Sequence, residues 1–352
     1  MPAMTHERHE ESPLLRLEDV RTYYPVRGRG LFGARQAIRA VDGITLDIHR
    51  RETLGLVGES GSGKSTLGRT ILGLAPLTGG TVRFEEQDLS RISSKAWRGY
   101  RRSLQIVFQD PFASLNPRMT VEQIVGEPLR NFGLARGPEL RRRVLALIDR
   151  VGLRQAHADR YPHEFSGGQR QRIGIARALA LEPSLIVCDE PVSALDVSVQ
   201  AQIVNLLMDL QEERGMSLLF IAHDLAVVEH ISQRVAVMYL GKVMEVGPGR
   251  AIFGAAAHPY TQALLSAVPA PDPDAPRNRV ILSGDIPSAS SPPSGCRFRT
   301  RCVHAHARCA QEEPTLRQLH PGHWSACHLH DESPAADAAP APVPIDETRS
   351  LS

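Results

Sequence analysis

A glycine-rich segment in the first quarter of the chain carries its strongest chemical signal. Residues 58–66 read GESGSGKST and fit the pattern G-x-x-x-x-G-K-[ST], whose backbone N–H groups surround a phosphate. Glycine is needed because a Cβ would hold the phosphate away from the backbone. Lys64 is placed to reach the β- and γ-phosphates, and the Ser65 hydroxyl to ligate Mg²⁺. The predicted nucleotide ligands in this loop are Gly58, Ser60, Gly61, Ser62, Gly63, Lys64, Ser65 and Thr66.

Two acidic residues follow a short apolar run later in the chain. Residues 185–188 are Leu-Ile-Val-Cys, and Asp189 and Glu190 come directly after them. A carboxylate at the end of a strand, such as Asp189, reaches Mg²⁺ directly or through water. Glu190 is placed to orient and polarise the attacking water. Two acids can also cap a following helix, but the phosphate-binding pattern upstream favours the metal and water roles.

The segments around these residues have the hydrophobic periodicity of an α/β protein. Residues 54–57 form an apolar strand that leads into the glycine loop, and residues 66–74 continue as a helix. Residues 14–90 are rich in strand patterns, whereas helical spacing dominates residues 95–180. Strands and helices alternate over residues 185–246, which predicts parallel β–α units.

Length and composition set the broad class of the protein. The 352 residues include 42% hydrophobic and 23% charged residues, with a net charge of +2, so composition indicates no nucleic-acid partner. No apolar run approaches the roughly 18 residues that span a bilayer. Residues 1–12 are polar and lack the apolar core of a secretory signal, which predicts a cytoplasmic protein. We find no internal repeat, so we expect one nucleotide-binding domain.

The order of the motifs resembles the nucleotide-binding domain of ATP-binding cassette (ABC) proteins. The phosphate loop is followed by residues 165–169, FSGGQ, and then by the acids at 189 and 190. The resemblance implies a P-loop NTPase fold of the α/β class, with a RecA-like core, an antiparallel β subdomain and an α-helical subdomain. It also implies a dimer, because in this family the glycine loop and the FSGGQ segment of one chain complete ATP sites with the partner chain. Glu190 would be the general base.

The same resemblance implies roles for residues that spacing alone does not identify. His223, after the apolar residues 218–222, matches the switch histidine that contacts the γ-phosphate, and Gln109 matches the glutamine that senses Mg²⁺ and the attacking water. Asp196 belongs to the segment that touches the opposite subunit. Phe165 stands where the family usually has Leu, and it should pack in the helical subdomain. The residues expected to bind the partner's nucleotide, before a helix starting near residue 169, are Ser166, Gly167, Gly168 and Gln169.

An aromatic residue near the N-terminus is the candidate adenine contact. The family keeps a ring stacked on adenine at the position of Tyr23-Tyr24-Pro25. When the segment is aligned with the family from Val20, Tyr24 falls at the adenine-stacking position, and Tyr23 remains the alternative. Stacking contributes on the order of 1 kcal/mol beyond area burial. A tyrosine that only packs on the sheet edge is the competing interpretation.

Three further segments resemble one group within the family. Residues 108–117 (FQDPFASLNP), 258–265 (HPYTQALL) and 295–298 (GCRF), with LFG at 31–33, look like the ATPase subunits of dipeptide and oligopeptide importers. That group also includes importers of nickel and related solutes. The resemblance covers residues 14–328. It implies a second homologous ATPase as partner, in a heterodimer or a homodimer, two transmembrane permease subunits and, indirectly, a substrate-binding protein, at the cytoplasmic face of the membrane.

Four of the five cysteines lie close to the C-terminus. Cys296, Cys302, Cys309 and Cys327 are spaced C-x5-C-x6-C-x17-C, which matches neither zinc-finger nor bacterial ferredoxin spacing. A reducing compartment argues against disulfides. The resemblance to the importer group implies that the four thiolates bind a [4Fe-4S] cluster. Zinc is the main alternative, with histidines nearby, and buried reduced thiols without a metal are the third. The nearby histidines are His304, His306, His323 and His328.

These observations predict four segments and one leading function. We expect a disordered N-terminus (1–13), a nucleotide-binding domain (14–265) whose helical subdomain spans about 110–180, a C-terminal Cys-rich extension (266–330) and a disordered Ala/Pro-rich tail (331–352). The leading hypothesis is the ATP-hydrolysing motor of a membrane importer. A soluble cassette protein acting on DNA or ribosomes, and a metal-dependent regulator with a vestigial ATPase, are the alternatives.

Overall fold

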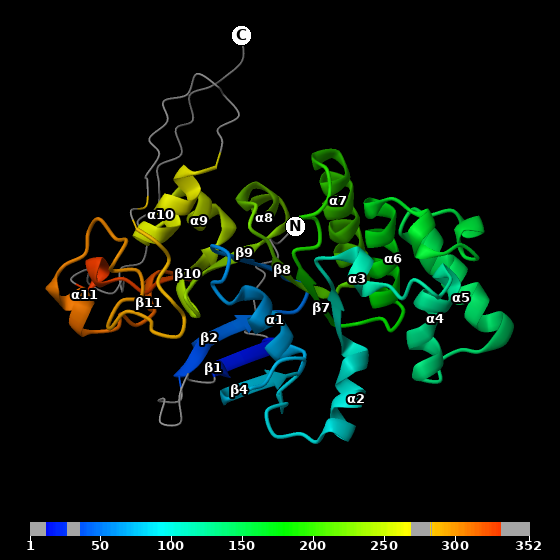
Figure 1. Ribbon diagram of the computed structural model, residues 1–352, viewed down its shortest axis with the longest axis horizontal. Helices are drawn as coiled ribbons and strands as arrows, with labels where there is room; N and C mark the ends of the chain where they lie inside the picture. Colours follow the sequence, from blue (N-terminus) through cyan, green and yellow to red (C-terminus); the bar gives the residue numbers. More distant parts are fainter. Residues whose placement is uncertain (1–11, 27–35, 269–281, 283, 332–352) are drawn as a thin grey trace, which may run out of the picture.

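The computed structural model describes residues 12–26, 36–268, 282 and 284–331, which form two β-sheets with helices around them (Figure 1). The smaller sheet contains β1 (Leu15–Val26), β2 (Gln36–Ile48), β4 (Gly79–Phe84) and β5 (Gln87–Asp88). The larger sheet contains β3 (Thr53–Val57), β6 (Leu104–Val107), β7 (Leu185–Asp189), β8 (Ser217–Ile221), β9 (Arg234–Tyr239), β10 (Lys242–Pro248), β11 (Arg317–His320) and β12 (His323–Ser325). The predicted α/β fold is confirmed.

The parallel centre of the larger sheet is buried on both faces. Its strands run in the order β6-β7-β8-β3-β9, and β3, β7 and β8 have no exposed residue. Such strands are continuous apolar runs because helices or another sheet cover each face. In β8, Leu218 and Phe220 pack with the helices of one face, whereas Leu219 and Ile221 pack with α1 (Lys64–Ile71) and the smaller sheet.

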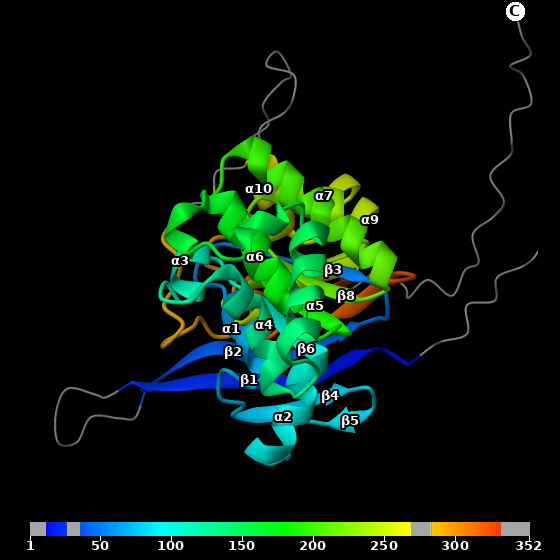
Figure 2. The same ribbon diagram turned by 90° about the vertical axis from the view of Figure 1, so that its right-hand side faces the viewer.

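The smaller sheet is antiparallel and lies against the face of the larger sheet that carries α1. Its strand order is β2-β1-β4-β5. Apolar side chains from it, such as Leu17, Val41 and Val82, share one core with Leu67 of α1 and Leu219 of β8. Figure 2 shows this sheet below the main body of the molecule. It therefore supports the glycine loop from the side of β2.

Helices form one end of the molecule. They are α3 (Pro111–Ser114), α4 (Val121–Asn131), α5 (Gly137–Arg150) and α6 (Gly167–Leu179), with short 3-10 turns η1 (Gln155–His157) and η2 (Pro162–Glu164). α2 (Ser94–Ser103) precedes β6 and packs instead on the core of the smaller sheet through Trp97 and Tyr100. Phe165 is buried in the helical end, with its ring edge-on to His157 at 5.3 Å, so its predicted packing is confirmed. The remaining helices of the core are α7 (Val197–Arg214) and α8 (Leu225–Ile231), which lie beside the larger sheet.

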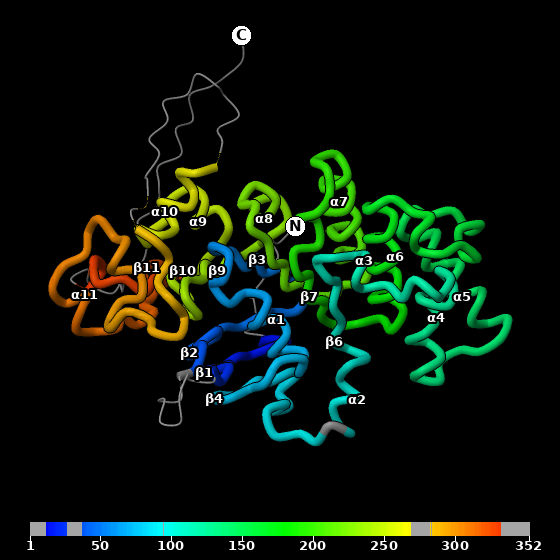
Figure 3. The backbone as a smooth tube through the Cα atoms, viewed as in Figure 1, coloured from blue at the N-terminus to red at the C-terminus, as the bar shows by residue number. Residues whose placement is uncertain are grey.

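The C-terminal segments form the opposite end of the molecule, as Figure 3 shows. They comprise α9 (Gly249–Gly254), α10 (Pro259–Ser266), α11 (Ala307–Gln311), the 3-10 turn η3 (His328–His330) and strands β11 and β12. β12 pairs antiparallel with β10, with Trp324 opposite Val246. The end of the predicted extension therefore continues the core sheet.

Three predicted boundaries differ from the structure. The helix expected over 66–74 spans Lys64–Ile71, because Gly63 adopts a φ of 104° and the helix begins directly at the glycine loop. The helix expected near residue 169 begins at Gly167, since Ser166 is its N-cap. β9 and β10 form an antiparallel hairpin, so the prediction of parallel units up to residue 246 is wrong at its end.

Some predictions fall outside the described residues. These are the LFG segment at 31–33, most of the N-terminus predicted to be disordered, and the tail beyond residue 331. Among the described residues, no helix combines the length and the apolar character that a membrane span requires.

Candidate nucleotide-binding site

The phosphate loop connects the end of β3 to the start of α1. Gly58 and Gly63 both have positive φ angles, of 146° and 104°. A Cβ at Gly58 would collide with the backbone carbonyl of Met238, and one at Gly63 with that of Ala40. Both positions therefore require glycine for conformation and for space. The result is a loop whose N–H groups and following helix N-terminus can face an anion.

Lys64 lies under this loop and is 5% exposed. Its Nζ donates to the backbone carbonyls of Gly58 at 2.7 Å and Glu59 at 3.0 Å. Burial lowers the pKa of Lys64, although the charges of Glu190, Asp189 and Glu59 oppose that shift. The acidic neighbours thus favour the protonated amine that a triphosphate needs.

Ser65 and Asp189 form the predicted magnesium position. The Ser65 hydroxyl donates to Asp189 Oδ1 at 2.6 Å, and Arg69 lies 3.6 Å from Asp189 Oδ2. Asp189 is the last residue of β7 and is only 2% exposed. A hydroxyl and a carboxylate are hard oxygen donors, and Mg²⁺ is bound by a few such groups together with phosphate oxygens. The donor set therefore fits the ion.

Glu190, Gln109 and His223 meet at the same edge of the sheet. Gln109 Nε2 donates to Glu190 Oε2 at 2.7 Å, and His223 Nδ1 lies 3.5 Å from the same oxygen. Glu190 has a φ of 48°, in the left-handed region that non-glycine residues rarely adopt. Backbone strain of this kind is concentrated at functional sites. Glu190 and Gln109, predicted to act on the attacking water, are thus in direct contact, and His223, predicted to contact the γ-phosphate, lies beside them.

An open cleft of about 380 Å³ joins these groups. It brings the phosphate loop together with Gln109, Glu190 and His223. Two of its walls were not predicted: one is Ile38 and Ala40 of β2, and the other is Ala289 of the C-terminal extension. The residues that line it are Ile38, Ala40, Ser60, Gly61, Gly63, Lys64, Ser65, Thr66, Gln109, Glu190, His223 and Ala289.

The candidate adenine contact lies beside this cleft. Tyr24 is 36% exposed and is the cross-strand partner of Ile38, so both side chains are on the same face of the sheet. The Tyr23 hydroxyl instead donates to Asp42, and the guanidinium of Arg39 lies 5.9 Å from the Tyr23 ring. Tyr23 is thus held by neighbouring side chains, which favours Tyr24 for stacking. Adenine contact by Tyr24 stays a prediction.

The FSGGQ segment does not reach the cleft of its own chain. Ser166 is exposed and caps α6, where it exchanges hydrogen bonds with Gln169 in a capping box. Gly168 packs so closely on Val199 that a Cβ would collide with it, and Asp196 caps α7. Among the described residues that line the cleft, none belongs to 165–169 or to the segment around Asp196. Nucleotide contacts by Ser166, Gly167, Gly168, Gln169 and Asp196 stay predictions.

The four C-terminal cysteines gather in one region but are not arranged as metal ligands. Cys296 and Cys309 are buried, whereas Cys302 and Cys327 are half-buried. Burial raises the pKa of the Cys327 thiol to about 11, and the charges of the other three thiols add to that shift. Over the part of the chain that the structure describes, however, no group of three or more His, Cys, Asp or Glu could hold a metal ion. The geometry therefore does not support the predicted [4Fe-4S] cluster.

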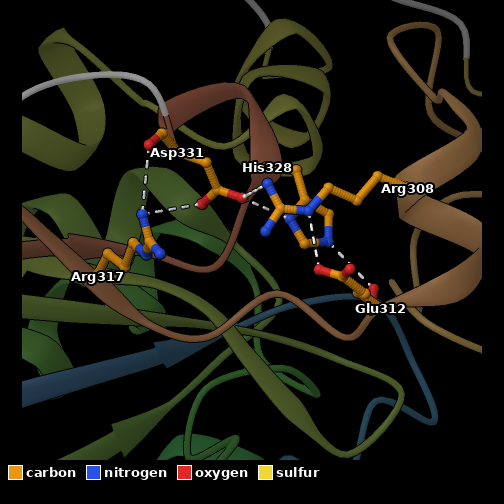
Figure 4. Close-up of polar contacts among 5 residues, drawn as sticks. All are labelled: Arg308, Glu312, Arg317, His328 and Asp331. Atoms are coloured by element: carbon orange, nitrogen blue, oxygen red, sulfur yellow. Dashed lines mark hydrogen bonds and ion pairs between the residues drawn. The ribbon is translucent and has the colours of Figure 1, made fainter.

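Two of the histidines considered for zinc are engaged elsewhere. His323 Nε2 lies 2.7 Å from the buried Glu245 carboxylate. Figure 4 shows His328 between Asp331 and Glu312, with its Nδ1 2.8 Å from the Asp331 carboxylate and its Nε2 3.1 Å from the Glu312 carbonyl. Arg308 and Arg317 also pair with Asp331. This network joins α11, β11 and η3.

Two known protein families match parts of this chain, and the matched residues include the motifs described above. The family described as ABC transporter matches residues 41–193, which include the phosphate loop, the FSGGQ segment and both acids. The family described as oligopeptide/dipeptide transporter, C-terminal region, matches residues 244–309, from β10 to α11.

Individual proteins are similar over most of the chain. The oligopeptide transport ATP-binding protein OppF of Salmonella typhimurium is 55% identical over 309 residues, covering 86% of this chain and 92% of that protein. The oligopeptide transport ATP-binding protein AppF of Bacillus subtilis is 50% identical over 324 residues, covering 91% and 98%. Among solved structures, cbiO1 of Clostridium perfringens, part of the ABC transporter complex cbiONQ, is 30% identical with a TM-score of 0.60, covering 70% of this chain and 92% of that one. The ATP-binding cassette MJ0796, solved as a dimer with ADP and Pi, is 31% identical with a TM-score of 0.59, covering 67% and 99%.

Proposed function

The chain belongs to the ATP-binding subunits of the ABC importers for dipeptides and oligopeptides, and we propose that it is the ATP-hydrolysing motor of such a peptide importer. One observation carries the proposal. A single cleft is lined by Lys64, Ser65, Gln109 and Glu190; Ser65 donates to the buried Asp189, and Gln109 donates to Glu190. These are the groups that bind a triphosphate, hold its metal and activate water.

The glycine loop and Lys64 bind and orient the triphosphate. The backbone N–H groups of residues 60–64 and the N-terminus of α1 offer donors to phosphate oxygens, and Lys64 supplies positive charge. Ser65 and Asp189 would hold Mg²⁺, which neutralises charge on the phosphates when it is bound. Positioning and charge stabilisation of this kind account for most of the catalysis in phosphoryl transfer.

Glu190 is the proposed general base for the attacking water. Its carboxylate lies at the cleft and is 18% exposed, so a water between it and the phosphate would be partly shielded from solvent. Gln109 donates to one Glu190 oxygen and leaves the other available. Water adds to the γ-phosphorus, Glu190 accepts the water proton, and the bond to the β-phosphate oxygen breaks to give ADP and phosphate. His223, 3.5 Å from Glu190, is placed to contact the γ-phosphate.

A second ATPase subunit is needed to complete the site. Ser166, the N-cap of α6, is exposed, and neither it nor the first turn of α6 lines the cleft of the same chain, which supports their use by a partner's nucleotide. We propose a heterodimer with a homologous ATPase, docked on two transmembrane permeases at the cytoplasmic face of the membrane. The permeases would receive peptide from a substrate-binding protein. ATP-driven closure of the two cassettes would then be coupled to movement of the permeases.

Purification from membranes tests this function. Affinity capture of the chain from detergent-solubilised membranes should recover polytopic membrane proteins and a second ATPase. In proteoliposomes, the recovered assembly should hydrolyse ATP faster when a binding protein loaded with peptide is supplied. Recovery of the chain only with ribosomes or DNA, and no membrane-associated pool, would contradict the proposal.

We also retain the four cysteines as candidate ligands of a [4Fe-4S] cluster, with zinc as the alternative. The proximity of the four thiols supports this assignment, and the lack of a metal-holding group among the described residues speaks against it. Elemental analysis of the chain purified without oxygen separates the alternatives. Iron that is lost when all four cysteines become Ser would support the cluster. Equal iron content in the two proteins would end that hypothesis, and stoichiometric zinc would favour the alternative.

A further inference from the structure

The segment between Cys296 and Cys302 contacts the phosphate loop. Arg301, in this segment, forms a bidentate pair with Glu59, the second residue of the loop: Nη1 lies 2.5 Å from Oε2 and Nη2 3.0 Å from Oε1. Arg301 is 7% exposed and the Glu59 side chain 23% exposed. Paired charges at this level of burial are geometrically specific, because each would be costly to leave alone.

The backbone of Glu59 is held by a second C-terminal contact. The N–H of Glu59 donates to the Tyr260 hydroxyl at 2.9 Å, and Tyr260 belongs to α10. The Tyr260 ring packs on Tyr239 at 4.8 Å and on Phe298 at 5.2 Å. Phe298 lies in the same short segment as Arg301. Main chain and side chain of Glu59 are thus both fixed from the C-terminal side.

Glu59 is connected directly to the groups that bind phosphate. Its carbonyl accepts from Lys64 Nζ at 3.0 Å and from the Ser62 N–H at 3.2 Å. Its carboxylate carries negative charge within the loop that receives a triphosphate. Unlike charges attract and like charges repel over such distances, most strongly where water is partly excluded. An unpaired Glu59 would therefore weaken nucleotide binding.

We propose that Arg301 is a positioning residue for the phosphate loop: it neutralises Glu59 and holds the loop in the shape that accepts ATP. This inference rests on the proposed function as an ATPase. It gives the C-terminal extension a role in nucleotide binding that is independent of any metal. A second contact supports it, because Ala289 of the extension lines the nucleotide cleft and accepts a hydrogen bond from the Arg39 N–H at 3.0 Å.

The pair acts as a fixed element rather than a pH switch. The hydrogen bond from Arg301 to Glu59 raises the pKa of Arg301 above its already high ordinary value. The guanidinium therefore stays charged throughout the physiological range. Its effect on the loop should depend on its presence and geometry, not on proton concentration.

Equilibrium binding of MgATP to the full-length chain tests the inference. Arg301→Met keeps the length of the side chain but removes its charge, so the Kd for MgATP should rise on the order of 10-fold. The double variant Arg301→Met/Glu59→Gln removes the unpaired carboxylate, and its Kd should return to within about 3-fold of wild type. Arg299→Met is the matched control, because Arg299 lies in the same segment but bonds Ser294. Its Kd should be unchanged.

The variants separate positioning from general destabilisation. Loss of packing alone would lower the melting temperature of Arg301→Met and of the double variant alike, without restoring affinity in the double variant. In the assembled ATPase, Arg301→Met should raise KM more than it lowers kcat. Wild-type affinity in Arg301→Met, or no recovery in the double variant, would overturn the inference. Failure of the wild-type chain to bind MgATP would instead refute the proposed function.

Discussion

Glu190 combines an unusual backbone conformation with two specific side-chain neighbours. Its N–H donates to the Ile221 carbonyl of β8 at 3.0 Å, and its φ of 48° turns the side chain out of the line of β7. A left-handed conformation costs a non-glycine residue on the order of 1 kcal/mol. Contacts with the surrounding strands offset this conformational free energy, and the carboxylate contacts Gln109 at the cleft. The conformation is consistent with a carboxylate held ready for reaction.

Glu190→Gln should separate nucleotide binding from hydrolysis. The amide is nearly isosteric but cannot accept a proton from water, so kcat should fall by about 10² to 10⁴. The Kd for MgATP should change little, because Lys64 and the glycine loop remain. We expect the closed dimer to accumulate with ATP, which size-exclusion chromatography would detect. Glu229→Gln, an exposed carboxylate on α8, is the control and should hydrolyse ATP normally. Normal turnover in Glu190→Gln would refute the assignment of the base.

Residues that act through local motifs could be predicted from the sequence, whereas long-range pairs could not. Lys64 and Ser65 follow from a contiguous pattern with one known geometry. The Arg301–Glu59 pair joins residues 242 positions apart, and neither belongs to a motif that names its partner. Ala289 reaches the cleft only because the extension folds back on β2. Such contacts depend on tertiary packing, which hydrophobic periodicity does not encode.

At the scale of elements, the interior strands and long helices agree with the sequence patterns. β3, β7 and β8 are short apolar runs that fit only the centre of a covered sheet. Helix ends were less predictable, because single residues determine them. Gly63 starts α1 through its positive φ, and Ser166 starts α6 through a capping box. The β9–β10 hairpin was missed because Leu240 and Gly241 both adopt positive φ, a turn that no strong dipeptide signal marks.

The N-cap of α10 makes the C-terminal side of the molecule sensitive to acid. His258 is 1% exposed, and its Nδ1 accepts a hydrogen bond from the Tyr260 N–H at 3.0 Å, which requires a neutral ring. Burial lowers the pKa of His258 from 6.5 to about 4. Below pH 6.5 the unfolded chain takes up a proton that the folded chain resists. The stabilisation is therefore complete above pH 6.5 and is lost as the pH falls toward 4, by up to about 3 kcal/mol.

His258→Asn should flatten this pH dependence. Asn also caps helices but does not titrate, so the variant should lose less stability than wild type between pH 6.5 and pH 4. Its stability at pH 7 should be lower, since the imidazole packs near Phe298 at 5.9 Å. Urea unfolding followed by the combined fluorescence of Trp97 and Trp324 would measure both effects. His49→Asn, at an exposed position, is the control and should keep the wild-type slope. An unchanged slope in His258→Asn would contradict the assignment.

At the scale of the whole molecule, the chain carries two separate candidate half-sites for nucleotide: the cleft and the N-terminus of α6. The cleft is lined by the glycine loop together with Gln109, Glu190 and His223, whereas the exposed Ser166 at the N-cap of α6 does not line it. Ser166 already satisfies the local N-cap, and Gly167 and Gly168 pack on the segment that leads into α7. The N-terminus of a helix is suited to an anion. In the proposed dimer that anion is the nucleotide held by the partner subunit.

Ser166→Asp tests this arrangement without breaking the helix. Aspartate is as good an N-cap as serine and interacts favourably with the helix dipole, so α6 should remain stable. The added charge would repel the partner's triphosphate. We expect the single chain to bind MgATP with a Kd within about 2-fold of wild type, but hydrolysis at the composite site should fall about 10²-fold or more. Lys64→Ala should show the opposite pattern, with weakened binding by the chain itself.

Thr120→Asp is the matched control, because Thr120 caps α4 in a similar capping box but lies in the helical end of the molecule. It introduces the same charge at the same kind of position, and the assembled ATPase should retain wild-type hydrolysis. If Ser166→Asp also retained full hydrolysis while the chain was paired with its partner, the N-terminus of α6 would not contact nucleotide. If Ser166→Asp instead lost ATP binding as a single chain, both half-sites would belong to one subunit. Only selective loss of hydrolysis in the pair is consistent with a nucleotide held between two chains.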